Sequence, residues 1–154
     1  MRTFKLVILL LVVFSACKTK PITNTQANIN NNINFTELES GGHSNIYEKR
    51  NYVINSKEEL TSLYKSLNAS RFPKIAIPKV DFTKNSIIAL LMGSKSSGGH
   101  RIVLDHITSN GSDVSVYYRE FSPKGMATSV MTQPYYLAVT SKINTEVTFI
   151  KINN

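Results

Sequence analysis

The chain has 154 residues, 42% of them hydrophobic and 18% charged, which fits one ordinary globular domain and leaves no room for two. Its net charge of +8 becomes +6 when Arg2 and Lys5 are set aside, with 16 basic and 10 acidic residues remaining. The basic residues are scattered and never form a run of four, so the charge does not indicate nucleic-acid binding. Cys17 is the only cysteine, which excludes an internal disulfide.

The first 16 residues do not belong to the folded domain. Arg2 and Lys5 precede a nine-residue apolar run, Leu6 to Phe14. As a helix this run is only ~14 Å long, about half of a hydrocarbon core. We therefore predict a signal peptide over residues 1–16 rather than a membrane-spanning helix.

The end of this segment, Ser15-Ala16-Cys17, resembles a bacterial lipobox, in which small residues lead directly into a cysteine. The resemblance implies cleavage before Cys17 and acylation of its thiol, with palmitate as a typical chain. Two or more acyl chains hold a protein stably on a bilayer, whereas one chain does so only marginally. Lys18, in place of an aspartate, favours the outer over the inner membrane by the usual sorting pattern. Which face of that membrane is used stays open.

Residues 17–34 are polar, rich in Asn and Thr, and lack periodic apolar positions, so we predict a flexible tether that begins with the lipidated Cys17. A coil of this length spans ~20–25 Å root-mean-square. The folded domain is expected over residues 35–154.

Two short extended segments, Phe35–Ser40 and Tyr52–Ile54, surround a glycine-containing loop. A helix then follows, because Ser56 and Glu59 have the spacing of a capping box. The helix presents one apolar stripe at helical spacing, formed by Leu60, Leu63, Tyr64 and Leu67. After it, residues 73–80 carry two prolines and are expected to be extended or at a sheet edge.

The rest of the chain is predicted to form β-strands. Residues 86–92 are continuously apolar, as expected of a strand that is buried on both faces. Asn110-Gly111 predicts a hairpin turn, since both residues tolerate positive φ. The expected strands around these features are 102–108, 114–118, 134–140 and 147–152.

No helical stretch separates these strands, so the sheet should be mostly antiparallel. The predicted fold is α+β: a mostly antiparallel curved sheet of about five to seven strands with one packed α-helix.

Residues 121–133 form a connection longer than most hairpin loops, which makes this loop a functional candidate beside the alternative of a plain surface excursion. Met126 and Met131 would be adaptable apolar contacts. Tyr136 could join them, whereas its neighbour Tyr135 is expected in the core.

The sequence predicts no catalytic residue, no metal site and no cofactor. Gly98-Gly99 precedes a strand, whereas a phosphate-binding glycine loop opens a helix. A Gly-x-Ser-x-Gly elbow is absent, and no spacing favours any pair among Asp81, Asp105, Asp113 and Glu120. The histidines are His43, His100 and His106, of which the first two each follow a glycine pair. A zinc site needs three or four ligands, and the sequence alone does not bring His43 near the others.

Four blocks in order resemble the C-terminal domain of PrcB-like proteins, over residues 35–154. The matching positions are Asp81-Phe82 before a buried strand, Gly98-Gly99 before the next strand and Pro134-Tyr135 before a later one. His100 departs from the aromatic residue that the family usually has after its glycine pair, and Tyr64 takes the place of the usual helix tryptophan.

PrcB-like proteins take their name from an accessory lipoprotein of a bacterial surface protease complex. The resemblance implies a membrane-anchored, non-enzymatic lipoprotein that binds and stabilises a partner protein, such as a protease. The alternative is a small-ligand or metal-binding lipoprotein built around His100. In either case we expect Gly98-Gly99 to allow a tight turn into the following strand, because glycine adopts backbone conformations that are closed to residues with a Cβ.

Overall fold

The computed structural model describes residues 31–153. The predicted signal peptide and Cys17 lie outside this range. The described elements are β1 (Asn31–Ile33), β2 (Phe35–Gly41), β3 (Lys49–Ile54), α1 (Lys57–Leu67), β4 (Asn85–Met92), β5 (Arg101–Ser109), β6 (Val114–Phe121), β7 (Tyr135–Ser141) and β8 (Val147–Lys151). Within residues 31–153, no helix is both long enough and apolar enough to span a bilayer.

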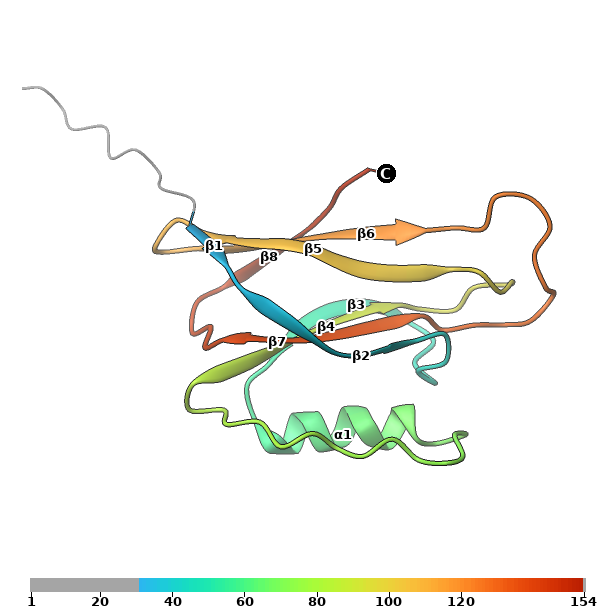
Figure 1. Cartoon of the computed structure of the whole chain (residues 1–154), viewed down its shortest axis with the longest axis horizontal. Helices are drawn as coiled ribbons and strands as arrows, with labels where there is room; N and C mark the ends of the chain where they lie inside the picture. The colour runs from blue at the N-terminus through green and yellow to red at the C-terminus, as the bar shows by residue number, and fades with distance from the viewer. Residues whose placement is uncertain (1–30, 154) are drawn as a thin grey trace, which may run out of the picture.

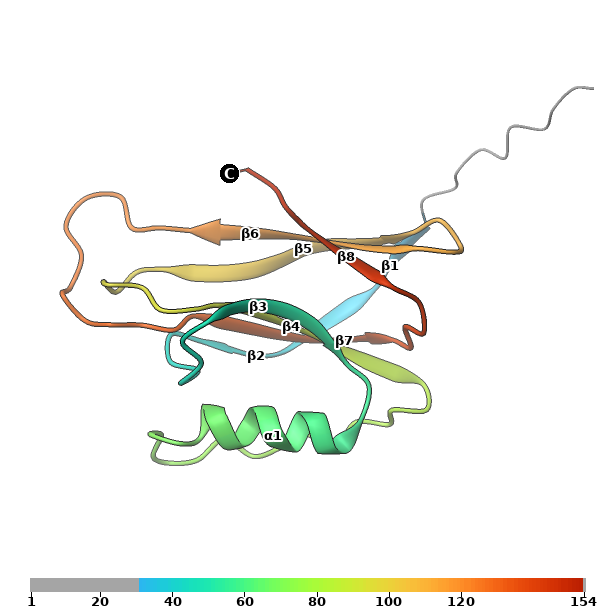
Figure 2. The ribbon, with the colours of Figure 1, turned by 180° about the vertical axis from the view of Figure 1, so that it is seen from behind.

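These elements form three layers (Figure 1). One sheet has the strand order β1-β5-β6-β8, and a second sheet beneath it has the order β2-β7-β4-β3. Helix α1 covers the other face of the second sheet, as both side views show (Figure 2). All strand pairs are antiparallel except β6 with β8, which are parallel. The predicted mostly antiparallel α+β fold with one helix is therefore confirmed for the described residues.

Strand β4 is apolar along its length because it lies in the middle layer. Ile88 and Leu90 point into the core between the two sheets, whereas Ile87, Ala89 and Leu91 point into the core beneath the helix. Alternate side chains of a strand face opposite ways, and here both sides are covered. The prediction that this strand is buried on both faces is confirmed.

The helix begins at the residue that the sequence predicted. The side-chain oxygen of Ser56 accepts a hydrogen bond from the backbone N–H of Glu59 at 3.2 Å. The carboxylate of Glu59 accepts from the backbone N–H of Asn55 rather than from that of Ser56, so the capping box is displaced by one residue. The whole predicted stripe is buried against the second sheet: Leu60, Leu63, Tyr64 and Leu67.

The number and arrangement of the strands differ from the expectation of one curved sheet with five to seven strands. Eight strands are present among the described residues, and they divide equally between two sheets. The strands divide into two sheets because β4 and β7 carry apolar side chains on both faces. The single helix covers only one of these faces. The second cover is the β1-β5-β6-β8 sheet.

The predicted tether boundary at residue 34 needs a correction. Residues Asn31–Ile33 form β1 and pair with Ser109, Thr108 and Ile107 of β5. The side-chain hydroxyl of Thr140 also donates to the carbonyl of Asn34. Ile33 supplies the reason, because it packs against the core between the sheets despite its polar neighbours. The chain then crosses directly into β2 of the other sheet, which joins the two sheets along one side.

On the opposite side of the sandwich, ion pairs join the two sheets. The carboxylate of Glu120 on β6 lies 2.6 Å from the ammonium of Lys49 on β3 and 2.9 Å from that of Lys151 on β8. Burial of Glu120 acts to raise its pKa, but the hydrogen bonds from both lysines outweigh burial and hold the pKa below its usual value. The three side chains connect the exposed edges of both sheets.

The sandwich has two distinct ends. At one end, called here the tether end, Asn31 pairs with Ser109 beside the β5–β6 hairpin. At the other, called the loop end, Arg101 pairs with Phe121. Arg101 and Ser109 are eight positions apart along β5, or roughly 25 Å. The long connection from β6 to β7 therefore lies at the end opposite to Asn31 (Figure 1).

The predicted hairpin between β5 and β6 is confirmed, with a turn different from the expected one. Gly111 has φ +96°, but Asn110 does not have positive φ. Instead the side-chain oxygen of Asn110 accepts from the backbone N–H groups of Ser112 and Asp113. The asparagine thus closes the turn through its side chain.

Candidate functional site

The 121–133 loop is held by the neighbouring 93–100 loop. The backbone groups of Lys95 and Thr132 exchange two hydrogen bonds, at 2.8 and 2.9 Å. The hydroxyl of Thr132 also donates to the carbonyl of Ser97 at 2.9 Å. The long loop is consequently fixed at its base rather than projecting freely.

The pair Gly98-Gly99 lies at the contact between these two loops. Gly99 has φ +80°, so the predicted tight turn is confirmed at this position. Gly98 is needed for a different reason: a Cβ there would collide with the hydroxyl of Thr128. Its backbone N–H donates to the carbonyl of Thr128 at 3.0 Å. The glycine pair therefore supports the 121–133 loop as well as turning the chain into β5.

The second glycine pair, Gly41-Gly42, supports the same loop from the other side. The carbonyl of Gly42 accepts from the N–H of Gln133 at 2.7 Å, and the N–H of Ser44 donates to the carbonyl of Gln133 at 3.0 Å. Gly41 lies beneath the ring of Tyr135, where a Cβ would be 2.9 Å from a ring carbon. The repeated Gly-Gly-His sequence thus marks two loops that flank one connection.

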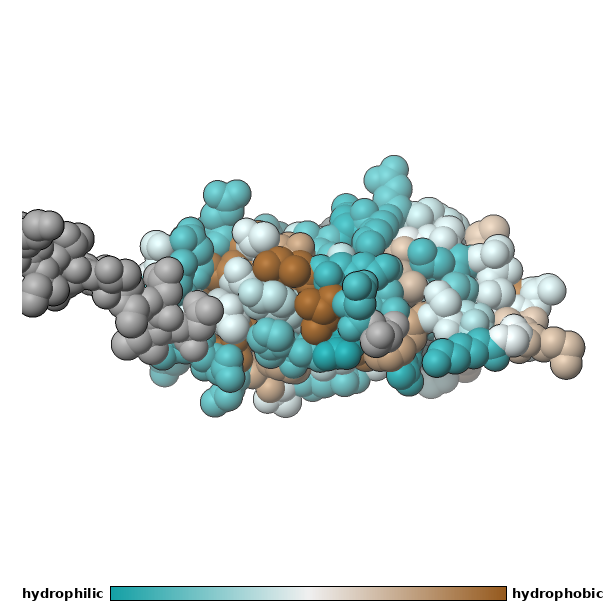
Figure 3. Space-filling view, turned by 90° about the horizontal axis from the view of Figure 1, so that it is seen from above, coloured by the Kyte–Doolittle hydropathy of each residue, from teal (hydrophilic) through white to brown (hydrophobic). Residues whose placement is uncertain are grey.

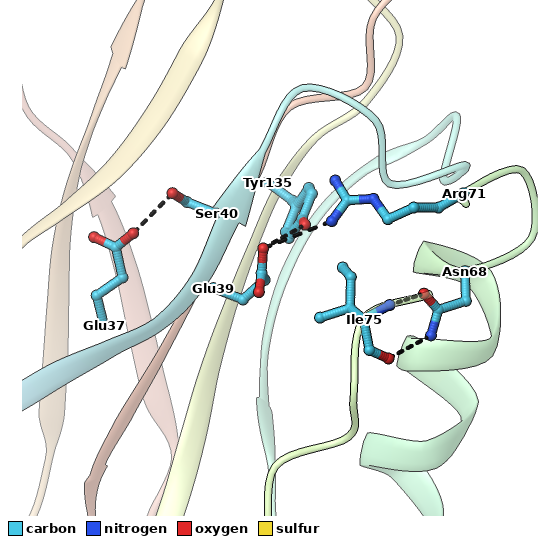
Figure 4. A network of polar contacts seen from close by, with 7 residues as sticks. All are labelled: Glu37, Glu39, Ser40, Asn68, Arg71, Ile75 and Tyr135. Carbon is cyan, nitrogen blue, oxygen red and sulfur yellow. Dashed lines mark hydrogen bonds and ion pairs between the residues drawn. The ribbon is translucent and has the colours of Figure 1, made fainter. Parts of the chain in front are cut away.

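A network of polar contacts fixes the segment after the helix at this end (Figure 4). Tyr135 donates its hydroxyl to Glu39 at 3.3 Å, and the guanidinium of Arg71 lies 3.7 Å from the same carboxylate oxygen. The side chain of Asn68 exchanges two hydrogen bonds with the backbone of Ile75. Burial, followed by the charge of Glu39, raises the pKa of Tyr135, so its hydroxyl stays protonated and can donate.

Exposed apolar side chains gather at the loop end. Met126 is fully exposed and Met131 is 60% exposed, and Val130 between them is exposed as well. From above, moderately apolar side chains protrude at this end of the molecule (Figure 3). The other large exposed apolar residues among residues 31–153 are Tyr47, Phe72 and Ile77.

Tyr47 and Phe72 belong to this end too. The carbonyl of Tyr47 accepts from the N–H of Ser94 in the 93–100 loop. Phe72 follows the C-terminal end of α1, where Asn45 donates to the carbonyl of Ser66. A shallow depression of 360 Å³ lies beside Tyr47 and is lined by Asn45, Ile46, Glu48, Arg50 and Ser66.

The expectation that Tyr136 joins this surface is wrong. Tyr136 is only 6% exposed and packs between the two sheets, whereas Tyr135 is 1% exposed and packs beneath the helix. Strand β7 is an inner strand covered on both faces, so neither of two consecutive residues reaches solvent. Burial, together with Glu37, raises the pKa of Tyr136 to about 12. The expected core position of Tyr135 is confirmed.

The three histidines have separate surroundings. His43 forms a backbone bridge with Gln133, and His100 lies 3.1 Å from the hydroxyl of Ser97. His106 lies 2.7 Å from Asp105 and stacks on Tyr117 on the outer face of β5 and β6. In the part of the chain that the structure describes, no group of three or more His, Cys, Asp or Glu side chains is arranged to hold a metal ion.

A β-bulge explains why spacing alone misplaced Asp105. Simple alternation along a strand would place the neighbouring residues Asp105 and His106 on opposite faces. The pairing register shifts between Leu104 and His106, so both side chains lie on the outer face. The hydrogen bond from His106, followed by that from Arg119, holds the pKa of Asp105 below its usual value.

The carboxylates considered for catalysis each have a local partner. Asp81 accepts from Thr83 in the turn before β4, and Asp113 accepts from Ser112 in the β5–β6 hairpin. Asp105 binds Arg119, and Glu120 binds two lysines. Each of these contacts stabilises a turn or joins strands.

A family model described as PrcB C-terminal matches residues 86–141. The match confirms the resemblance over this segment, which runs from β4 to the end of β7 and includes both the glycine pair Gly98-Gly99 and the 121–133 loop. No curated protein and no solved structure matches the chain.

Proposed function

Because residues 86–141 are PrcB C-terminal-like, we propose that the chain is a membrane-anchored, non-enzymatic accessory lipoprotein that binds and stabilises a partner protein of the cell envelope. The family name suggests a protease complex as that partner. The observation that carries the proposal is the loop end, where Met126, Val130 and Met131 are exposed on a connection braced by two flanking loops.

Exposed apolar side chains that cluster on a solvent-facing surface are typical of interaction sites. Methionine suits such a site because its unbranched, polarisable side chain adapts to irregular partner surfaces. The bracing matters as well, since a loop already fixed by hydrogen bonds loses less conformational entropy on binding. The hydrogen bonds of Lys95, Gly98 and Gly42 to this loop therefore support affinity without contacting the partner.

The position of residue 31, at the end of the domain opposite to the 121–133 loop, supports an anchored accessory role. Residue 31 lies at the tether end, and the 121–133 loop lies at the loop end. A lipid on Cys17 would attach the molecule through its tether end, so the loop end carries no anchor and stays accessible. A partner that projects from the same membrane, or an associated soluble protein, would then meet the loop end.

Co-purification from detergent-solubilised membranes tests this function. The variant Met126→Ser/Met131→Ser removes the two exposed methionines, and Ile77→Ser is the matched control, an exposed apolar residue outside the loop. We expect the partner that co-purifies with the wild type to be lost from the double variant and retained by the control. Equal recovery of the partner with all three proteins would show that the 121–133 loop does not bind it.

A further inference from the structure

The two ends of the sandwich differ in charge. At the loop end, the loops 42–48, 68–75, 93–100 and 121–133 carry four basic residues and one acidic residue, a net charge of +3: Arg71, Lys74, Lys95, Lys124 and Glu48. At the tether end, the connections 55–56, 81–84, 110–113 and 142–146 carry two basic and three acidic residues, a net charge of −1: Lys84, Lys142, Asp81, Asp113 and Glu146. The basic surplus of the described domain is thus concentrated beside the exposed apolar residues.

Most of this positive charge is not neutralised within the domain. Among the described residues, Arg71 forms an ion pair with Glu39, whereas Lys74, Lys95 and Lys124 form none. Arg50 and Arg101, which begin or nearly begin the adjoining strands, lie over the rings of Tyr52 and Phe121 rather than beside carboxylates. These cations remain available to an external anionic group.

An apolar centre with a charged rim is the usual anatomy of a specific protein interface. Here Met126, Val130 and Met131 are the exposed apolar residues of the 121–133 loop, Lys124 lies in the same loop, and Lys95 lies in the 93–100 loop that supports it. We propose that the loop end binds an acidic protein segment that also carries apolar side chains. This inference rests on the proposed function and adds the chemistry of the partner.

An anionic lipid surface is negatively charged like an acidic protein segment, but the position of residue 31 favours a protein. Residue 31 is at the tether end, so an anchor preceding it leaves the loop end as the part of the domain farther from the point of attachment. The shallow depression beside Tyr47 is bordered by Arg50, whose guanidinium suits a carboxylate of such a segment. Complementary charge would also accelerate encounter with an acidic partner and make binding sensitive to salt.

Defined peptides test the proposal without knowledge of the natural partner. The probe is a set of immobilised 15-residue peptides in which the number of glutamates and the number of leucines vary independently, with lysine-containing peptides of equal length for comparison. We expect the strongest binding by peptides rich in both glutamate and leucine, with a loss of about tenfold or more between 50 and 300 mM salt.

Charge reversal provides the matched comparison. Lys95→Glu/Lys124→Glu should weaken binding to the acidic, leucine-containing peptides by about tenfold or more. Lys57→Glu/Lys84→Glu changes the net charge equally at the tether end, on two exposed lysines, and should leave binding within about twofold of the wild type. Equal effects of the two double variants would overturn the proposal, as would binding that does not depend on glutamate content or no binding at all.

Vesicles containing 30% phosphatidylglycerol form a separate arm. Binding of these vesicles through Lys95 and Lys124 without binding of acidic peptides would place a membrane at the loop end and overturn the proposal. The proposed function is decided independently: if the methionine double variant loses its co-purifying partner while the peptides show no acidic preference, the function stands and this inference fails.

Discussion

Gly98 lies directly against Thr128, because its backbone N–H donates to the Thr128 carbonyl at 3.0 Å and a Cβ at Gly98 would collide with the Thr128 hydroxyl. A residue that opens a strand in the sequence thus also supports a loop about 30 positions later. The close approach of the 93–100 and 121–133 loops, rather than a local turn alone, favours glycine at this position.

Gly98→Ala should therefore destabilise the domain, by about 1–3 kcal/mol in the free energy of unfolding, because the added methyl forces Thr128 away. Gly42→Ala is the control, since nothing lies within 4 Å of a Cβ at Gly42 and its φ is not positive. We expect the control to change stability by less than about 1 kcal/mol in either direction. Urea denaturation followed by circular dichroism measures both, and equal losses would contradict the role assigned to Gly98.

Glu120→Gln should weaken the joint between β3, β6 and β8 by about 1–2 kcal/mol at pH 7, because two half-exposed lysines lose a charged acceptor. The folded pKa of Glu120 is lowered, so its contribution is present above the ordinary value of 4.5 and is lost as the pH falls through the folded value. The stability difference between the variant and the wild type should therefore close in acid. Glu146→Gln, on an exposed loop, is the control; a difference that persists unchanged at pH 2 would argue against the charged joint.

The buried tyrosines predict a loss of stability in alkali. Burial raises the pKa values of Tyr64 and Tyr136 to about 12 from the usual 10. Because these folded values are raised, the stabilisation is complete below pH 10 and is lost as the pH rises toward 12. Tyr136→Phe should make the decline of unfolding free energy above pH 10 shallower, by at most about 1.4 kcal/mol per pH unit. Identical slopes for variant and wild type between pH 10 and 11 would show that Tyr136 ionises normally.

Cys17 determines the predicted compartment. Cys17→Ser should leave an uncleaved precursor and remove the acyl mass from the mature N-terminus, because the hydroxyl cannot replace the acylated thiol. Immunoblotting and intact-mass spectrometry of the membrane fraction measure both changes. A wild-type protein that carries an unmodified thiol at Cys17 would contradict the predicted lipid anchor.

Local patterns in the sequence were sufficient for the elements whose environment is set by nearby residues. The capping signal at Ser56 and the stripe from Leu60 to Leu67 predicted α1, and the continuous apolar run predicted the burial of β4. Positive φ at Gly99 followed from the same kind of local reasoning.

Long-range packing decided what the sequence could not predict. Tyr136 is buried because β7 became an inner strand with cover on both faces, and the pairing of Ile33 with Ile107 drew β1 out of the predicted tether. The bulge at Asp105 reversed the face expected from simple alternation. The convergence of two glycine pairs on one loop likewise requires strands that are distant in the sequence to end side by side.

Site-specific photo-crosslinking in intact cells tests the central claim most directly. A photoreactive amino acid is placed at Met131, in the 121–133 loop, and in parallel at Ser112, in the hairpin at the tether end. Our account predicts a discrete protein adduct from position 131 and none from position 112. The same adduct from both positions, or an adduct from position 112 alone, would show that the partner does not bind at the loop end.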